Sequence, residues 1–165
     1  AWFSALDQWS VANQIPTISK ETLSESSEFR GDIAVSCYFD QILSPSEIAG
    51  VKLALNVHNS LLPQHRGIAP IEWALNNGDR FQGVTVHSID EGIDDGAIWG
   101  QVSFELEPSM TPSEVHALCR RDGFILITHV LRHVDDIMPR EQQATNASYH
   151  SFEDLAKLQQ EQWGN

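Results

Sequence analysis

The chain has 165 residues, 41% of them hydrophobic and 20% charged, and this length suits one domain with a real core. Its formal net charge is −13, with only ten lysines and arginines, which disfavours extensive contact with tRNA or DNA. No apolar run has the length of a membrane span, and no segment resembles a signal peptide.

The first half of the chain predicts two buried strands and two short helices. A helix is expected over residues 2–12, where Trp2, Phe3, Leu6 and Trp9 share one side. Residues 33–37 and 53–57 are nearly continuous apolar runs, as parallel strands covered on both faces tend to be. Between them, Ser44-Pro-Ser-Glu47 carries an N-cap signature, and Gly50 closes that helix.

Further elements follow in alternation. We expect a helix over residues 69–77, then strands at 84–89 and 97–104. The capping signature Thr111-Pro-Ser-Glu114 then opens a long helix. Its apolar stripe consists of Val115, Leu118, Leu126, Val130 and Val134. Strands alternating with helices predict an α/β domain with a mostly parallel sheet and flanking helices.

The end of the chain is polar. Residues 139–148 are predicted to form a flexible linker, and Ser151-Phe-Glu-Asp154 has the signature of a further short helix. Cys37 and Cys119 are far apart and form no CxxC motif, so we expect two unpaired thiols in a reducing cytoplasm.

Three polar residues, two at the end of an apolar run and one in an acidic loop, are candidates for a catalytic site. Asn56 and His58 are two residues apart, so an extended strand would place both side chains on one side. Asp94 follows in a glycine-containing loop that could reach the same sheet edge. An amide can stabilise an oxyanion, and a histidine held by a carboxylate can move a proton at neutral pH. By themselves, however, these common residues are more simply explained as a strand-end cap and a turn residue.

The residues around them resemble a known family. The segments concerned are Asn56-Val-His-Asn-Ser-Leu-Leu-Pro63, Arg66-Gly-Ile-Ala-Pro-Ile-Glu-Trp-Ala74, Gly83-Val-Thr-Val-His87 and Asp90-Glu-Gly-Ile-Asp-Asp-Gly96. In this order they resemble the catalytic region of the formyltetrahydrofolate-dependent formyltransferases, a group that includes methionyl-tRNA and sugar N-formyltransferases. The resemblance is continuous from about residue 33 to 103. It implies the Rossmann-like formyltransferase fold over residues 1–138, with residues 139–165 as a linker and C-terminal helix.

The resemblance also implies roles for particular residues. Asn56 would bind the formyl oxygen, His58 would be the acid–base group, and Asp94 would orient His58 and help accept the proton of the amine. The co-substrate would be 10-formyltetrahydrofolate, with no metal. The implied folate-binding residues are Phe39, Ile42, Leu43, Ser60, Leu61, Leu62, Pro63, Ile89, Asp90 and Asp94. For Phe39, Ile42 and Leu43, ordinary core packing is the alternative.

The acceptor is the least defined part of this prediction. The Ala-Pro-Ile element favours the methionyl-tRNA and sugar branches, and the acidity of the chain favours a small primary amine, such as an amino sugar on a nucleotide. The family's first strand and helix have no counterpart in this sequence, so an N-terminally truncated domain is expected. A folate-binding or assembly module without catalysis, or a formyltetrahydrofolate hydrolase, would carry the same motifs. A homodimer is compatible with the sequence.

Overall fold

A central sheet of four strands organises the molecule. The computed structural model describes residues 8–17, 31–39, 41, 43 and 45–163. The strands lie in the order β1–β2–β4–β5. Their bounds are β1 Gly31–Cys37, β2 Val51–His58, β4 Phe81–Ser88 and β5 Ile98–Glu105. The helices are α3 Pro45–Ile48, α4 Pro70–Asn77, α5 Pro112–Arg132 and α6 Phe152–Trp163.

The predicted strands and helices are confirmed to within about three residues at their ends. Residues 8–12 are helical, and the rest of the helix expected over 2–12 lies outside the described residues. The capping box predicted at Thr111 is present: its hydroxyl accepts from the Glu114 N–H, and the Glu114 carboxylate accepts from the Thr111 N–H. Gly78 ends α4 in the left-handed region, at φ 67°.

The α/β class is confirmed, and the described strands pair in a mixed pattern. β1 and β2 are parallel, as their apolar runs predict, whereas β2–β4 and β4–β5 are antiparallel. The sequence does not reveal this difference, because β4 has strands on both edges and buried side chains along most of its length in either arrangement. Among the described strands of this four-stranded sheet, the parallel pairing is that of β1 with β2.

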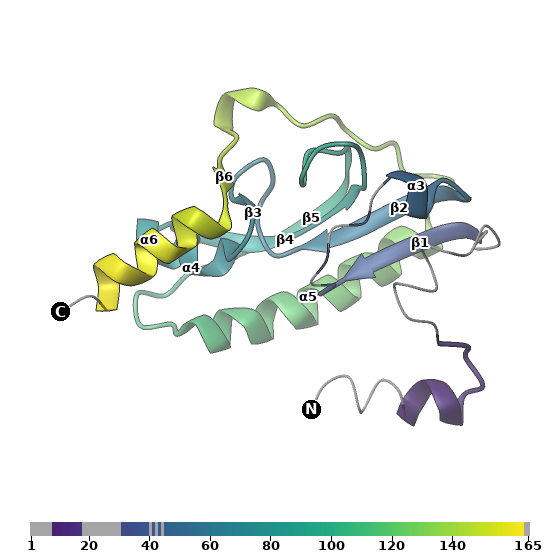
Figure 1. Cartoon of the computed structure of the whole chain (residues 1–165), viewed down its shortest axis with the longest axis horizontal. Helices are drawn as coiled ribbons and strands as arrows, with labels where there is room; N and C mark the ends of the chain where they lie inside the picture. The colour runs from purple at the N-terminus through teal and green to yellow at the C-terminus, as the bar shows by residue number, and fades with distance from the viewer. Residues whose placement is uncertain (1–7, 18–30, 40, 42, 44, 164–165) are drawn as a thin grey trace.

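The long helix α5 covers one face of the sheet (Figure 1). Its buried residues include Val115, Leu126 and Val130, which pack against strand residues such as Val57 and Val84. Gly123 permits this close approach, since a Cβ there would lie 3.2 Å from the nearer Val57 methyl.

The C-terminal segment returns along the side of the sheet away from α5 (Figure 1). Arg140 forms a β-bridge with Ile98, and a short 3₁₀ turn follows at Ala144–Asn146. A two-stranded sheet then joins β6, Tyr149–His150, in parallel to β3, Arg66–Gly67. The stretch 139–148, expected to be flexible, thus lies between a backbone pairing at Arg140 and another at Tyr149–His150.

Within the described residues, no helix combines the length and apolar character needed to cross a bilayer.

Candidate active site

Strands β2 and β4 present their polar residues to one face of the sheet. Leu55 and Val57 point into the core beneath, so the alternation of a strand places Asn56 and His58 on the opposite face. In the antiparallel pairing Asn56 lies directly across from His87. The Asn56 amide donates to His87 Nε2 at 3.1 Å.

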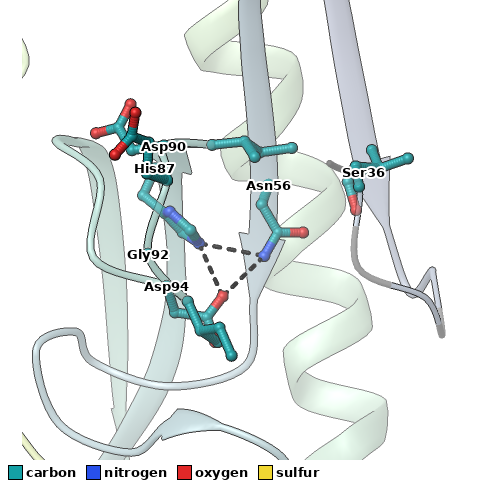
Figure 2. A pocket seen from close by; sticks show the side chains of 10 residues that line it. Ser36, Asn56, His87, Asp90, Gly92 and Asp94 are labelled. Atoms are coloured by element: carbon teal, nitrogen blue, oxygen red, sulfur yellow. Dashed lines mark hydrogen bonds and ion pairs between the residues drawn. The ribbon is translucent and has the colours of Figure 1, made fainter. Parts of the chain in front are cut away.

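Asp94 completes the cluster from the loop that joins β4 to β5. Its Oδ1 lies 3.4 Å from both Asn56 Nδ2 and His87 Nε2 (Figure 2). Its Oδ2 accepts a hydrogen bond from the Gly67 N–H at 2.8 Å and lies 3.4 Å from His58 Nδ1. One carboxylate therefore joins the two residues of β2, the histidine of β4 and the loop that contains β3.

The hydrogen bonds of His58 define its tautomer. Nε2 lies 2.8 Å from the carbonyl oxygen of His65, which can only accept, so Nε2 carries the hydrogen. Nδ1 is then a lone pair that faces Asp94 Oδ2. Two acceptors face each other here, and a single proton between them would satisfy both.

Burial decides the charge of this pair. It lowers the pKa of His58 below its ordinary value, against the opposing effects of Asp94 and of the His65 carbonyl. Burial also raises the pKa of Asp94, but its contacts with the rings of His87 and His58 and the hydrogen bond from the Gly67 N–H outweigh this effect, so the pKa of Asp94 is lowered. At neutral pH the site therefore holds a neutral histidine beside a carboxylate.

A cavity of about 310 Å³ opens beside this cluster (Figure 2). Asn56, His87 and Asp94 form its polar wall, and Leu43, Ile89 and Ile93 add apolar surface. The remaining lining residues are Ser36, Asp90, Glu91 and Gly92. His58 lies behind Asp94 and is not among the lining residues.

The predicted site residues divide into two groups. The structure brings Asn56, His58 and Asp94 together and places Leu43, Ile89 and Asp90 on the cavity wall. Phe39 is half exposed and does not line the cavity, and Ile42 lies outside the described residues.

The segment Ser60–Pro63 does not line the cavity either. The Ser60 hydroxyl donates to the Gln64 carbonyl at 2.6 Å, and its own carbonyl accepts from Thr85. The Leu62 N–H donates to the Thr85 hydroxyl. These hydrogen bonds fix the loop after β2.

His87 belongs to the cluster as well, although the sequence motifs assign it no role of its own. The signal was present, because strand alternation puts His87 on the face of Thr85 and opposite Val84 and Val86. No pattern in the sequence around Gly67 or Gln142 indicates that these residues hydrogen-bond to Asp94. Gln142 hydrogen-bonds Arg66 and the loop of Asp94 from the far end of the chain.

Among the residues that the structure describes, no three histidines, cysteines or carboxylates are grouped to hold a metal ion. His129 and His133 lie on one side of the end of α5 with ring centroids 4.6 Å apart.

A family model for formyl transferases matches residues 8–131, and the chain belongs to this family. The resemblance predicted from the sequence is therefore confirmed. The chain is 36% identical over 132 residues to methionyl-tRNA formyltransferase from Synechococcus sp. (strain JA-3-3Ab), covering 78% of this chain and 41% of that protein. It is 34% identical over 119 residues to methionyl-tRNA formyltransferase from Deinococcus radiodurans, covering 72% of this chain and 37% of that protein.

Solved structures of sugar N-formyltransferases share the fold. An N-formyltransferase from Helicobacter canadensis, solved with folinic acid and dTDP-3-aminofucose, superposes with a TM-score of 0.80 at 27% identity, covering 89% of this chain and 54% of that one. WlaRD, a sugar 3N-formyltransferase solved in the presence of dTDP and 5-N-formyl-THF, gives a TM-score of 0.79 at 27% identity, covering 90% of this chain and 54% of that one. This chain thus spans about half or less of the length of these relatives.

Proposed function

We propose that the chain transfers a formyl group from 10-formyltetrahydrofolate to a primary amine, through the cluster of Asn56, His58 and Asp94. The observation that carries this proposal is the single carboxylate of Asp94, which lines a cavity and contacts both Asn56 and His58. Membership of the formyl transferase family supports it, as do the folate derivatives named in the two sugar N-formyltransferase structures.

The cavity suits the pterin end of a folate. Its volume is within the range typical of small-molecule sites. Leu43, Ile89 and Ile93 offer apolar contact to a flat heterocycle, and Asp90 offers carboxylate oxygens to its N–H donors. The co-substrate supplies the formyl carbon; binding, orientation and proton transfer are the work of the chain.

The proton path runs through the buried pair. As the amine nitrogen forms its bond to the formyl carbon, it must lose a proton, and the acceptor is the carboxylate of Asp94, which lines the cavity and contacts Asn56. His58 Nδ1 then shares that proton from behind. The same proton is available for the folate nitrogen when its bond to the formyl carbon breaks, so the pair returns to its starting state.

Asn56 stabilises the charge that develops on the formyl oxygen. Both hydrogens of its amide are engaged, one with His87 Nε2 at 3.1 Å and one with Asp94 at 3.4 Å. The longer bond is the weaker, so the formyl oxygen takes the hydrogen directed at Asp94. His87 meanwhile holds the amide in place, since its own Nδ1 is fixed by donating to the Ser88 carbonyl.

For the acceptor we propose a small amino-sugar-type amine. Its support is the pair of sugar N-formyltransferase structures, one of which contains dTDP-3-aminofucose, together with the net charge of −13, which disfavours a polyanion. The sequence relatives favour a second candidate, the amine of methionyl-tRNA. Both acceptors present a primary amine to the same site.

A panel assay distinguishes these acceptors. The chain is incubated with 10-formyltetrahydrofolate and either nucleotide-linked amino sugars or methionyl-tRNA, and formylated products are identified by mass spectrometry. Formylation of an amino sugar by the wild type, together with loss of this activity in Asn56→Ala, supports the proposal. Formylation of the tRNA alone would show that methionyl-tRNA is the acceptor. Formate release without an acceptor would indicate a hydrolase. Folate binding without turnover would indicate a non-catalytic module.

A further inference from the structure

The side chain of Gln142 makes four hydrogen bonds next to the candidate active site. Its Oε1 accepts from Arg66 Nε at 3.1 Å and from Arg66 Nη2 at 2.7 Å. Its Nε2 donates to the carbonyl oxygen of Asp94 at 2.9 Å and to that of Gly96 at 2.8 Å. One amide therefore joins the loop of Asp94 to the loop that contains β3.

The chemistry of the partners fixes the orientation of this amide. A guanidinium can only donate, and a backbone carbonyl can only accept. Rotation of the amide of Gln142 by 180° would set its N–H groups against Arg66 and its oxygen against two carbonyls. The side chain consequently has one arrangement that satisfies all its partners.

The amide of Gln142 holds the backbone of Asp94 in place. This residue has φ 53°, in the left-handed region that a non-glycine residue enters at a cost of about 1–2 kcal/mol. The bond from Gln142 to the Asp94 carbonyl opposes relaxation of that backbone. Arg66, on the other side of the amide, precedes Gly67, whose N–H donates to the Asp94 carboxylate.

We propose that Gln142 is a positioning residue for Asp94, holding its carboxylate against His58 and Asn56 from a segment more than 45 residues further along the chain. As a statement about catalysis this rests on the proposed function, but the position of Asp94 can also be measured without turnover. The titratable groups that face His58 are Asp94, His87 and His65. Of these, only Asp94 favours the protonated ring, so the titration of His58 reports how near Asp94 is.

The decisive variant is Gln142→Glu. A carboxylate keeps the acceptor for Arg66, but it loses both donors and sets an oxygen against the carbonyls of Asp94 and Gly96. A role limited to anchoring the C-terminal segment through Arg66 would survive this change. The matched control is Gln143→Glu, which adds the same charge at the adjacent exposed position. Gln142→Ala removes all four bonds without adding a charge.

The experiment measures formyl-transfer kinetics, the pKa of His58 by NMR and the urea unfolding midpoint of each protein. We expect kcat to fall about 10- to 100-fold in Gln142→Glu and Gln142→Ala, with a smaller change in KM for the folate. We also expect the pKa of His58 to be lower in both than in the wild type, and Gln143→Glu to match the wild type. Unchanged kcat and unchanged His58 titration in folded Gln142→Glu would overturn the proposal. If the wild type transfers no formyl group, the proposed function fails, and the NMR titration alone decides the positioning role.

Discussion

Replacing Asp94 with Asn tests the buried pair most directly. The two side chains have the same shape, and an Asn oxygen can still accept from the Gly67 N–H. With that oxygen in the place of Oδ2, the amide nitrogen takes the place of Oδ1 and can donate to the lone pair of His87 Nε2, so the fold is retained. The negative charge beside His58 Nδ1 is lost.

The size of the effect follows from the distance. At 3.4 Å, a proton on His58 Nδ1 and the Asp94 carboxylate attract each other by about 5 kcal/mol at an effective dielectric constant of about 20. If half of this attraction acts in the transition state, the barrier rises by about 2.5 kcal/mol and kcat falls about 100-fold. Burial already lowers the pKa of His58 and Asp94 opposes it, so the pKa falls further when the charge is removed.

The assay follows release of tetrahydrofolate across the pH range, with NMR titration of His58 in the same samples. The control is Asp95→Asn, which removes a charge from the adjacent exposed residue of the loop. The reasoning is refuted if Asp94→Asn keeps more than about half of the wild-type kcat. A higher pKa of His58 in this variant would refute it equally.

Three further outcomes concern stability. Lowering the pH from about 7.5 to about 5.5 will reduce the free energy of unfolding. The reason is that His58 takes up a proton near pH 6.5 in the unfolded chain, whereas its pKa is lower in the folded protein. Urea titrations should show a weaker pH dependence in His58→Gln. Gly67→Ala should cost about 2 kcal/mol or more in urea unfolding, since its Cβ would lie 2.2 Å from the His150 carbonyl oxygen, whereas Gly78→Ala, with open space around it, should cost about 1 kcal/mol. Thr111→Ala should cost about 1 kcal/mol through the lost cap of α5, with kcat unchanged.

Local signals in the sequence were sufficient for most elements. The capping box at Thr111 and the glycine at position 78 mark helix ends through contacts within four residues, which a sequence displays directly. The strand period of two predicts that Asn56 and His58 share one face, and the structure confirms it. The glycine-containing loop of Asp94 indicated that this residue could reach the same sheet edge, and the family resemblance implied its contact with His58, because spacing alone gives no distance between a strand and a loop.

Other features depend on partners that the sequence does not bring together. β4 runs antiparallel to both its neighbours, and its buried residues would look alike in a parallel and in an antiparallel sheet. Gln142 stands among polar residues typical of a linker, and its partners are 76 and 48 residues away at Arg66 and Asp94. Because the sequence does not show this long-range pairing, an amide side chain in a polar segment predicts only that the side chain is exposed.

The return of the C-terminal segment also has a consequence for the order in which the chain folds. Asn56, His58 and Asp94 are synthesised early, but the hydrogen bonds that secure the Asp94 loop and β3 come from Gln142, Ser148 and β6. During translation the sheet can therefore form before the loops on its polar face are secured. A nascent chain that has not yet exposed residue 150 would hold these residues in a partly assembled arrangement, because long-range contacts form only once both partners are available.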